Sequence, residues 1–279
     1  MKLSIIVLAL GTFVPSHGFI QPSSFGTRVR HSRTSNTITC MSSTEVTPES
    51  ETLQSEFPPI LMELRDVAMK LHTKEQAPRE GQAAASEKPK EPFVPTQADY
   101  LKFLVDSCQV YKTLEEVVDR DELTEELGRF RNTGLERTNA LEQDIQWMCD
   151  KFSLERPPVG RPGQSYSDEL RNMITVKEDG TKEGIPEFVC HYYNFVFAHL
   201  AGGRMIGKQM SKMLLDGETL DFYKWGDDVN DLKAKVKDEI EVLAQGWTRK
   251  ERDECVGATA EAFKGGGAIN GYLYGGSPH

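Results

Sequence analysis

Beyond residue 50, apolar residues recur three or four positions apart through nearly the whole chain, and few stretches alternate with a period of two. This spacing is typical of helices that bury one face. It predicts an all-α protein with one compact domain over residues 55–265, interrupted by a flexible loop at 77–97 that is rich in Ala, Pro, Lys and Glu. The apolar positions of four expected helices are Leu61, Leu64, Val67 and Leu71; Tyr100, Phe103, Leu104, Val110, Tyr111 and Leu114; Leu135, Leu141, Ile145 and Met148; and Val229, Leu232, Val236, Ile240 and Leu243.

Residue types that favour helix ends mark several boundaries. A T-x-x-E capping box at Thr248 and Glu251 predicts the start of the last helix. Gly265–Gly267 is expected to end that helix, before a glycine-rich tail at 266–279. Other expected starts are Pro58 with Pro59, Ser165 for a short helix to about Met173, and Pro186 with Glu187 for a helix that runs to about Leu215.

The N-terminal segment has the composition of a targeting leader. Residues 1–18 contain a basic residue, an apolar run too short to span a membrane, and small residues before Phe19, as in a signal peptide. Residues 19–43 contain three arginines, many Ser and Thr, and no acidic residue, as in a transit peptide. We expect a disordered lead-in at 44–54. The alternative to a transit peptide is a disordered secreted tail after the signal.

A signal peptide followed by a transit peptide resembles the bipartite leader of algae with complex plastids, and it predicts location in the plastid stroma. The five cysteines are scattered and form no C-x-x-C pair or metal-binding spacing. They predict free thiols in a reducing compartment, which agrees with a stroma and disagrees with secretion.

The chain that follows the leader is strongly acidic. The leader holds four of the 33 basic residues and none of the 43 acidic ones, so the remainder has 29 against 43, a formal charge of −14. Such a charge does not suit nucleic acid or an anionic membrane. No later run reaches the roughly 18 apolar residues of a membrane span, so we expect no membrane anchor.

One histidine lies on an otherwise ordinary helix. His72 follows Arg65 by seven residues, about two helical turns, so the two share a face. Gln76, one turn further on, is placed to orient an imidazole that binds a metal. The alternative is a surface histidine at a helix end, where the helix dipole favours it.

A glycine pair interrupts the most apolar helix of the chain. Gly202 and Gly203 each cost about 1 kcal/mol of helix stability relative to alanine. Ala198 lies one turn before Gly202, so small residues form a slot on one face. Such a slot suits either a tightly packed neighbouring helix or a ligand that lies against the main chain.

Polar residues flank this slot. His199 is either a hydrogen-bonding group for a ligand or a satisfied core histidine, and Tyr193 either reaches an anionic group or only packs. Arg204, Lys208 and Lys212 repeat every four residues and form a basic stripe on one helix face. The stripe is either a docking surface for an acidic partner or a solvated face.

A flat iron macrocycle needs a histidine on one helix to bind the iron. On the facing helix it needs small residues, so that the macrocycle can lie against the main chain. Around these two segments the sequence closely resembles the plastid heme oxygenases of plants and algae, and the likeness runs from about residue 57 to 263. The residues that carry it form ordered blocks at 68–76, 103–107, 111–116, 130–137, 190–208, 222–225 and 247–249.

The resemblance implies one helical domain that holds heme b between a proximal and a distal helix. His72 matches the proximal iron ligand. Ala198, Gly202 and Gly203 match the distal positions whose main chain lies over the heme. His199 matches the position that organises proton delivery through distal water.

The resemblance also implies cationic contacts for the heme propionates. Arg65 and Tyr193 match positions that contact them. Glu239 aligns with a position that is usually cationic, so Lys235 or Lys237 is expected to replace that contact.

The implied activity is oxidation of heme by O2 to biliverdin, carbon monoxide and ferrous iron. No segment is typical of a flavin or nicotinamide site, so electrons would come from outside. The resemblance implies reduced ferredoxin as the donor, and we expect it to dock on Arg204, Lys208 and Lys212. Two alternatives stay open: a relative that binds a tetrapyrrole without turnover, and a helical interaction protein without a cofactor.

Overall fold

The structure is a computed structural model that describes residues 57–76 and 93–275, with the backbone alone at 72–76. The predicted signal peptide, transit peptide and lead-in lie outside the described residues, as does most of the expected loop at 77–97. The described part is helical apart from turns and one short hairpin, which confirms the all-α prediction.

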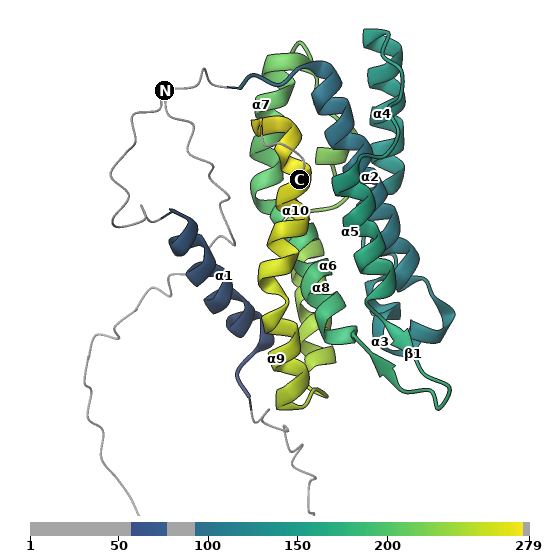
Figure 1. Cartoon of the computed structure of the whole chain (residues 1–279), viewed down its shortest axis with the longest axis vertical. Helices are drawn as coiled ribbons and strands as arrows, with labels where there is room; N and C mark the ends of the chain where they lie inside the picture. Colours follow the sequence, from purple (N-terminus) through teal and green to yellow (C-terminus); the bar gives the residue numbers. More distant parts are fainter. Residues whose placement is uncertain (1–56, 77–92, 276–279) are drawn as a thin grey trace, which may run out of the picture. The chain divides into compact units, whose positions relative to one another are not determined.

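The helices follow one another along the chain (Figure 1). They are α1 (Ile60–Gln76), α2 (Gln97–Val118), α3 (Thr124–Leu127), α4 (Thr138–Phe152), α5 (Arg161–Asn172), α6 (Ile185–Ala198), α7 (Arg204–Leu214), α8 (Val229–Ala244), α9 (Arg249–Gly257) and α10 (Thr259–Tyr274). Short 3-10 turns lie at Asp121–Leu123, Gly128–Phe130 and Asp221–Tyr223, and a π-helix lies at His199–Gly203. Strands β1 (Thr175–Val176) and β2 (Lys182–Glu183) form an antiparallel hairpin.

Helices α2 and α6 form the centre of the packing. Helix α2 packs against α4, α5 and α10, and α6 packs against α9 and α10. Large side chains fill the space between them, among them Tyr100, Tyr111, Phe130, Phe188 and Phe222, each at most 2% exposed. Burying each such ring stabilises the fold by about 1.5–3 kcal/mol.

Several helix starts lie where the sequence predicts them. Thr248 and Glu251 form the expected capping box, in which Thr248 Oγ1 accepts from the Glu251 amide at 3.3 Å. The helix that it starts is α9, which ends at Gly257, so the expectation that it starts the last helix is wrong: that helix is α10. Pro186 and Glu187 occupy the first turn of α6. Helix α1 begins directly after Pro59.

Two predicted boundaries are wrong. Helix α5 begins at Arg161 rather than at Ser165, because the Asp106 carboxylate of α2 accepts hydrogen bonds from the amides of Gly160 (2.7 Å) and Gly163 (2.9 Å). An acceptor 54 residues away in sequence replaces the local cap.

The glycines at 265–267 do not end the last helix, because α10 continues through them to Tyr274. A Cβ at Gly265 would come within 2.5 Å of the Tyr166 ring, so this glycine lets α10 approach α5 closely. Ile269 and Leu273 are buried beyond the glycines and hold the helix in place. The predicted tail is therefore helical as far as Tyr274.

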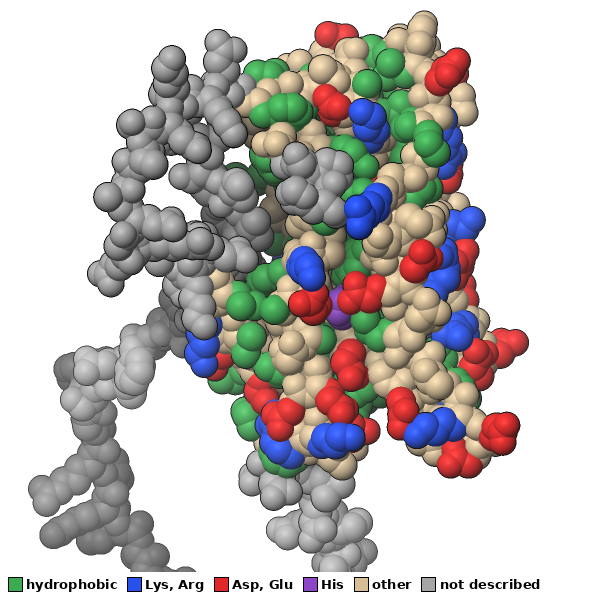
Figure 2. Space-filling model, viewed as in Figure 1, with side chains coloured by type: hydrophobic (Ala, Val, Ile, Leu, Met, Phe, Trp, Pro, Cys, Tyr) green, Lys and Arg blue, Asp and Glu red, His purple; other side chains and the backbone are tan. Residues whose placement is uncertain are grey.

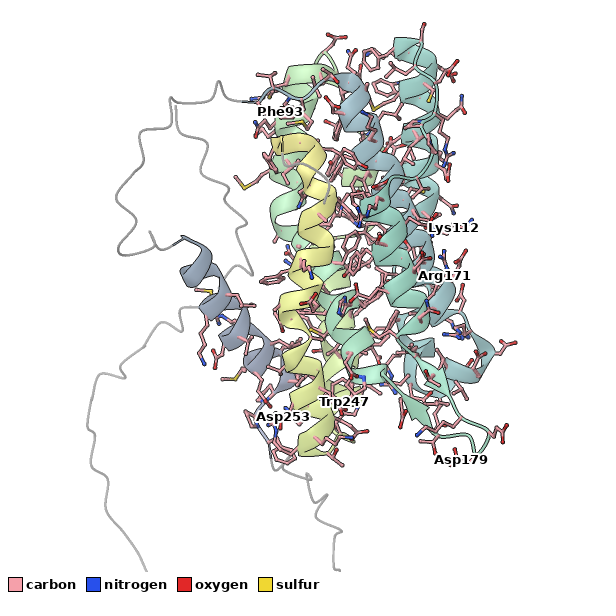
Figure 3. All side chains as sticks on the ribbon, viewed as in Figure 1. Phe93, Lys112, Arg171, Asp179, Trp247 and Asp253 are labelled. Carbon is pink, nitrogen blue, oxygen red and sulfur yellow. The ribbon has the colours of Figure 1, made fainter. Side chains whose placement is uncertain are left out.

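Charged side chains cover the face shown in Figure 2, and acidic ones gather toward the end that carries α9 and the β hairpin. Lys112 and Arg171 project outward from α2 and α5 (Figure 3), and both pair with Glu116 at 3.9 and 3.6 Å. Such exposed pairs contribute only about 0–1 kcal/mol each. None of the helices in the described ranges is long and apolar enough to cross a membrane.

Candidate functional site

The predicted glycine pair lies in a π-helix. Helix α6 ends at Ala198, the π-helix spans His199–Gly203, and α7 resumes the α-helical path at Arg204. A π-helical turn widens the helix by one residue, and such turns occur most often at functional sites. The helix expected from Pro186 to about Leu215 is therefore present with one local interruption.

The two glycines have different surroundings. A Cβ at Gly203 would lie 2.7 Å from Nδ1 of His199, so this glycine makes room for the imidazole. A Cβ at Gly202 would meet no atom within 4 Å, although the residue itself is buried. Ala198, one turn earlier, is exposed. The main chain at Gly202 is thus open to a ligand, whereas packing of His199 accounts for Gly203.

His199 is a buried and hydrogen-bonded histidine. Its Nε2 lies 3.0 Å from the carbonyl oxygen of Phe222, and its ring stacks on the Phe222 ring at 3.9 Å between centroids. A carbonyl only accepts hydrogen bonds, so Nε2 carries the proton and Nδ1 is left as an acceptor. Burial lowers the pKa of His199 to about 3, so the imidazole stays neutral. His199 can orient a donor but does not itself deliver a proton as an imidazolium.

A tyrosine hydroxyl beside His199 finds no partner among the described residues. The Tyr111 ring meets the His199 ring edge-on, at 6.0 Å between centroids. Its buried hydroxyl lacks a hydrogen bond and borders a cavity of about 10 Å³ that Glu115, Glu136 and Tyr192 also line. That volume suits about one water molecule with polar partners. The sequence shows Tyr111 only as a core position.

Three cations gather where α1, α6 and α8 meet. Burial lowers the pKa of the Lys237 ammonium, and the nearby charges of Lys233 and Arg65 lower it further. Lys237 Nζ lies 5.7 Å from the centre of the Phe197 ring. None of the three cations forms an ion pair with a carboxylate in the described part of the chain. Lys233 and Lys237 are half-buried and Arg65 is exposed, and cations without acidic partners suit an anionic ligand.

Tyr193 belongs to the same group. Its ring lies 4.6 Å from that of Phe197 and is 2% exposed. Burial raises the pKa of the Tyr193 phenol although the charge of Arg65 opposes this effect. The phenol therefore stays protonated and can donate a hydrogen bond.

The structure distinguishes the lysines that the sequence leaves open. Lys237 is half-buried beside Phe197, whereas Lys235 is exposed. Glu239, which aligns with a position that is usually cationic in the family it resembles, forms an ion pair with Arg129 at 3.1 Å. The geometry thus favours Lys237, in company with Lys233, as the cationic contact.

Helix α1 carries the predicted metal ligand. Ile60, Leu64 and Ala68, spaced four apart, are at most 2% exposed and face α8, α9 and α10. His72 lies in α1 one turn beyond Ala68, but its side chain, like that of Gln76, lies outside the described residues. Its role as ligand stays a prediction.

The basic stripe is exposed on α7, directly after the π-helix. Arg204, Lys208 and Lys212 are all exposed, and no acidic side chain of the described ranges pairs with them. The Arg204 guanidinium lies 6.0 Å from the centre of the Trp225 ring. Met205 and Met213 on the same helix are 56% and 44% exposed. An acidic, partly apolar surface would complement this face.

These features together fit a large flat ligand that carries carboxylates. Open main chain at Gly202 and the small side chain of Ala198 admit a planar face. The cations Arg65 and Lys237 and the phenol of Tyr193 suit acidic groups at one edge.

Comparisons with known proteins show which family this chain resembles. The family model described as heme oxygenase matches residues 61–266. "Heme oxygenase 3, chloroplastic" of Arabidopsis thaliana is 41% identical over 211 residues, which cover 74% of this chain and 70% of that protein. "Probable inactive heme oxygenase 2, chloroplastic" of the same plant is 37% identical over 179 residues, 64% of this chain and 57% of that protein. The structure of heme oxygenase-1 from the cyanobacterium Synechocystis in complex with heme has a TM-score of 0.56 at 19% identity, covering 78% of this chain and 93% of that chain.

Proposed function

The chain belongs to the heme oxygenase family, and we propose that it oxidises heme b with O2 to biliverdin, carbon monoxide and ferrous iron. The observation that carries the proposal is the π-helix at His199–Gly203, in which a Cβ at Gly202 would meet no atom within 4 Å. The cations Arg65, Lys233 and Lys237, which form no ion pair among the described residues, support it. The identity of 41% with a chloroplastic heme oxygenase supports it further.

The protein acts in the plastid. Chloroplastic relatives support this location, and the acid-free segment at 19–43 agrees with a transit peptide. Location in the stroma after passage of a bipartite leader is the finer part of the proposal. Free Cys108, Cys149, Cys190 and Cys255 in the described chain agree with a reducing compartment.

The residues around the π-helix have distinct roles in holding heme. When bound, heme supplies both the redox-active iron and the macrocycle that is cleaved. His72 would hold the iron as a neutral imidazole, and the main chain of Gly202 and the side chain of Ala198 would lie against the macrocycle. Arg65, Lys237 and the phenol of Tyr193 bind the propionates.

His199 contributes to proton delivery by orientation. Its Nε2–H is fixed by the Phe222 carbonyl, so Nδ1 is held as an acceptor beside Gly203. As an acceptor, Nδ1 would orient a water for proton transfer in the heme complex. The neutral state of the imidazole keeps this acceptor available throughout the physiological pH range.

A spectrum tests the binding part of the proposal. Hemin added to the purified protein is expected to give one Soret band that saturates at one equivalent. Turnover with a chemical reductant is then expected to yield biliverdin. Hemin binding without product would show a tetrapyrrole-binding protein, like the probable inactive relative, and absence of a Soret band would show a protein without a cofactor.

Lys237→Ala is expected to weaken heme binding about tenfold, because a half-buried cation then no longer meets a propionate. The matched control is Lys235→Ala, which removes an exposed lysine of the same helix and is expected to leave the affinity unchanged. The measurement is hemin titration of both variants. Equal affinities would refute the assignment of Lys237.

Reduced ferredoxin is the proposed electron donor, and the basic stripe is its docking surface. Reversal of Arg204, Lys208 and Lys212 to Glu is expected to raise the KM for ferredoxin more than tenfold and to remove the steep salt dependence of turnover. Turnover driven by a chemical reductant should not change. Reversal of Lys250 and Lys264, exposed cations on α9 and α10, is the control. Unchanged ferredoxin-driven turnover in the stripe variant would contradict the proposal.

A further inference from the structure

Helix α1 has no cap in its own sequence. The residues before it are Phe57, Pro58 and Pro59, which offer no side-chain acceptor for the free amides of the first turn. Glu241 of α8 supplies one instead. Its two carboxylate oxygens accept from the amides of Ile60 and Leu61, each at 2.9 Å. A carboxylate here also lies favourably at the positive end of the helix dipole.

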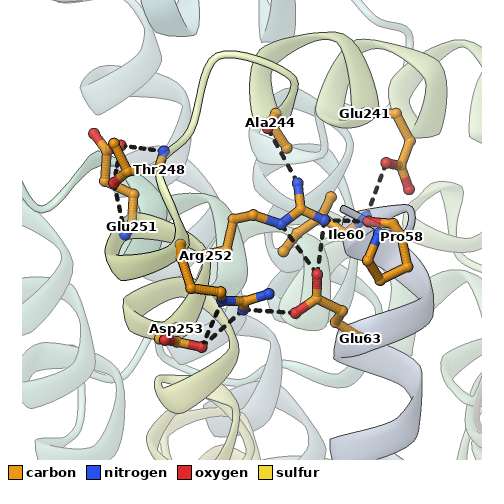
Figure 4. Close-up of polar contacts among 10 residues, drawn as sticks. Pro58, Ile60, Glu63, Glu241, Ala244, Thr248, Glu251, Arg252 and Asp253 are labelled. Carbon is orange, nitrogen blue, oxygen red and sulfur yellow. Dashed lines mark hydrogen bonds and ion pairs between the residues drawn. The ribbon is translucent and has the colours of Figure 1, made fainter. Parts of the chain in front are cut away.

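A buried arginine adds a second attachment at the same end of α1 (Figure 4). Arg252 of α9 is 2% exposed and donates to the Glu63 carboxylate from Nε at 3.0 Å and from Nη2 at 2.7 Å. Its Nη1 donates to the Ala244 carbonyl at 3.1 Å, and Nη2 also meets the Pro58 carbonyl. The planar fork of arginine thus joins the end of α8, the entry to α1 and the first turn of α1.

Hydrogen bonds from arginines of α9 stabilise the ionised form of Glu63. Partial burial favours the neutral acid, but hydrogen bonds from Arg249 and Arg252 outweigh it and lower the pKa of Glu63. Arg249 Nη2 lies 2.7 Å from the second carboxylate oxygen. Both oxygens of Glu63 are therefore occupied by arginines of α9.

Glu241, which holds the start of α1, lies on the same face of α8 as the lysines of the candidate site. Glu241 follows Lys237 by one turn and Lys233 by two turns, so all three share one face of α8. Arg65 lies two residues beyond Glu63 on α1. The contacts that hold α1 therefore also set its position relative to the propionate-binding lysines.

Small tilts at this end have large effects at the other end of α1. His72 lies nine residues beyond Glu63, about 14 Å along the helix axis. A tilt of about 4° about the first turn displaces that position by about 1 Å. Displacements of this size cost reactions about a hundredfold in rate when groups must meet in a fixed geometry.

We propose that Glu241 and the Glu63–Arg252 ion pair are positioning residues, which hold α1 at the tilt where His72 reaches the heme iron. The inference rests on the proposed function. It adds residues that touch neither heme nor O2 and act only through the helix that carries the ligand.

Hydrogen exchange of the heme-free protein tests the attachment itself. In Glu63→Gln and Glu241→Gln, amides at 64–71 are expected to exchange about fivefold faster or more, while α2 and α6 keep their wild-type rates. Glu63→Gln leaves Arg252 without its counter-charge. If that variant does not fold, Glu241→Gln still tests the proposal. The control is Glu126→Gln, whose carboxylate is 25% exposed and accepts from Lys182 at 2.7 Å. Unchanged exchange in α1, or an equal rise in every helix, would overturn the proposal.

Resonance Raman spectra of the ferrous heme complex test the effect on the ligand. The iron–histidine stretching band is expected to shift and broaden in Glu63→Gln and Glu241→Gln. Glu126→Gln should keep the wild-type band. If the wild type shows a histidine-ligated iron and both variants keep its band unchanged, the positioning role is overturned and the proposed function stands. A wild-type spectrum without a histidine-ligated iron would overturn the proposed function and the positioning role with it.

Discussion

Replacing His72 with Ala is expected to abolish ordinary turnover while the helical fold survives. Loss of an outer hydrogen-bond partner already costs a metal site about 10- to 100-fold, so loss of the proposed iron ligand itself should cost more. Added imidazole is expected to restore part of the activity, because the truncated side chain leaves room for it. The measurements are biliverdin formation and the ferric heme spectrum, with and without imidazole.

The fold should not depend on His72, because the contacts of α1 that the structure describes lie before it. Ile60, Leu64 and Ala68 form the buried face of α1, and Glu63 accepts hydrogen bonds from Arg252 of α9. Circular dichroism of the variant should therefore match that of the wild type. Met62→Ala, at a 57% exposed position of α1, is the control and should turn over heme normally. Near wild-type biliverdin formation by His72→Ala without imidazole would show that another group binds the iron.

The fold was largely predictable because its helices carry local signals. The capping box at Thr248 and Glu251, the prolines before α1 and the proline in the first turn of α6 act within one turn of the chain, so the sequence alone places them. The errors have a common cause. Asp106 caps α5 from α2, and Tyr166 lies against Gly265 from α5, and neither partner is near in sequence.

The candidate site was predictable in its residue types but not in their division of roles. Gly202 and Gly203 are alike in sequence, and only the position of the His199 ring separates them. Lys235 and Lys237 differ in burial: Lys235 is exposed on α8, whereas Lys237 is half-buried beside Phe197. The one hint of the contact between Glu241 and α1 is the absence of a capping residue before Ile60.

Replacing Gly202 is expected to separate the stability of the heme-free protein from its function. A Cβ at this position meets no atom within 4 Å, so Gly202→Ala should stabilise the heme-free protein by up to about 1 kcal/mol through helix propensity. The same methyl group lies where the main chain is to cover the heme, so affinity and turnover should fall. Gly202→Leu should lower the affinity further and alter the biliverdin isomer.

Gly203→Ala is the matched comparison and should give the opposite pattern in the heme-free protein. Its Cβ would press on Nδ1 of His199 at 2.7 Å, and forced displacement of a packed ring costs about 1–3 kcal/mol. Thermal unfolding of the heme-free variants, hemin titration and product analysis measure the three effects. If Gly202→Leu binds heme with unaltered affinity and yields the wild-type isomer, then Gly202 does not lie against the heme and the distal cover lies elsewhere. A more stable but less active Gly202→Ala would instead show that this glycine is kept for the ligand, at a cost to the helix that carries it.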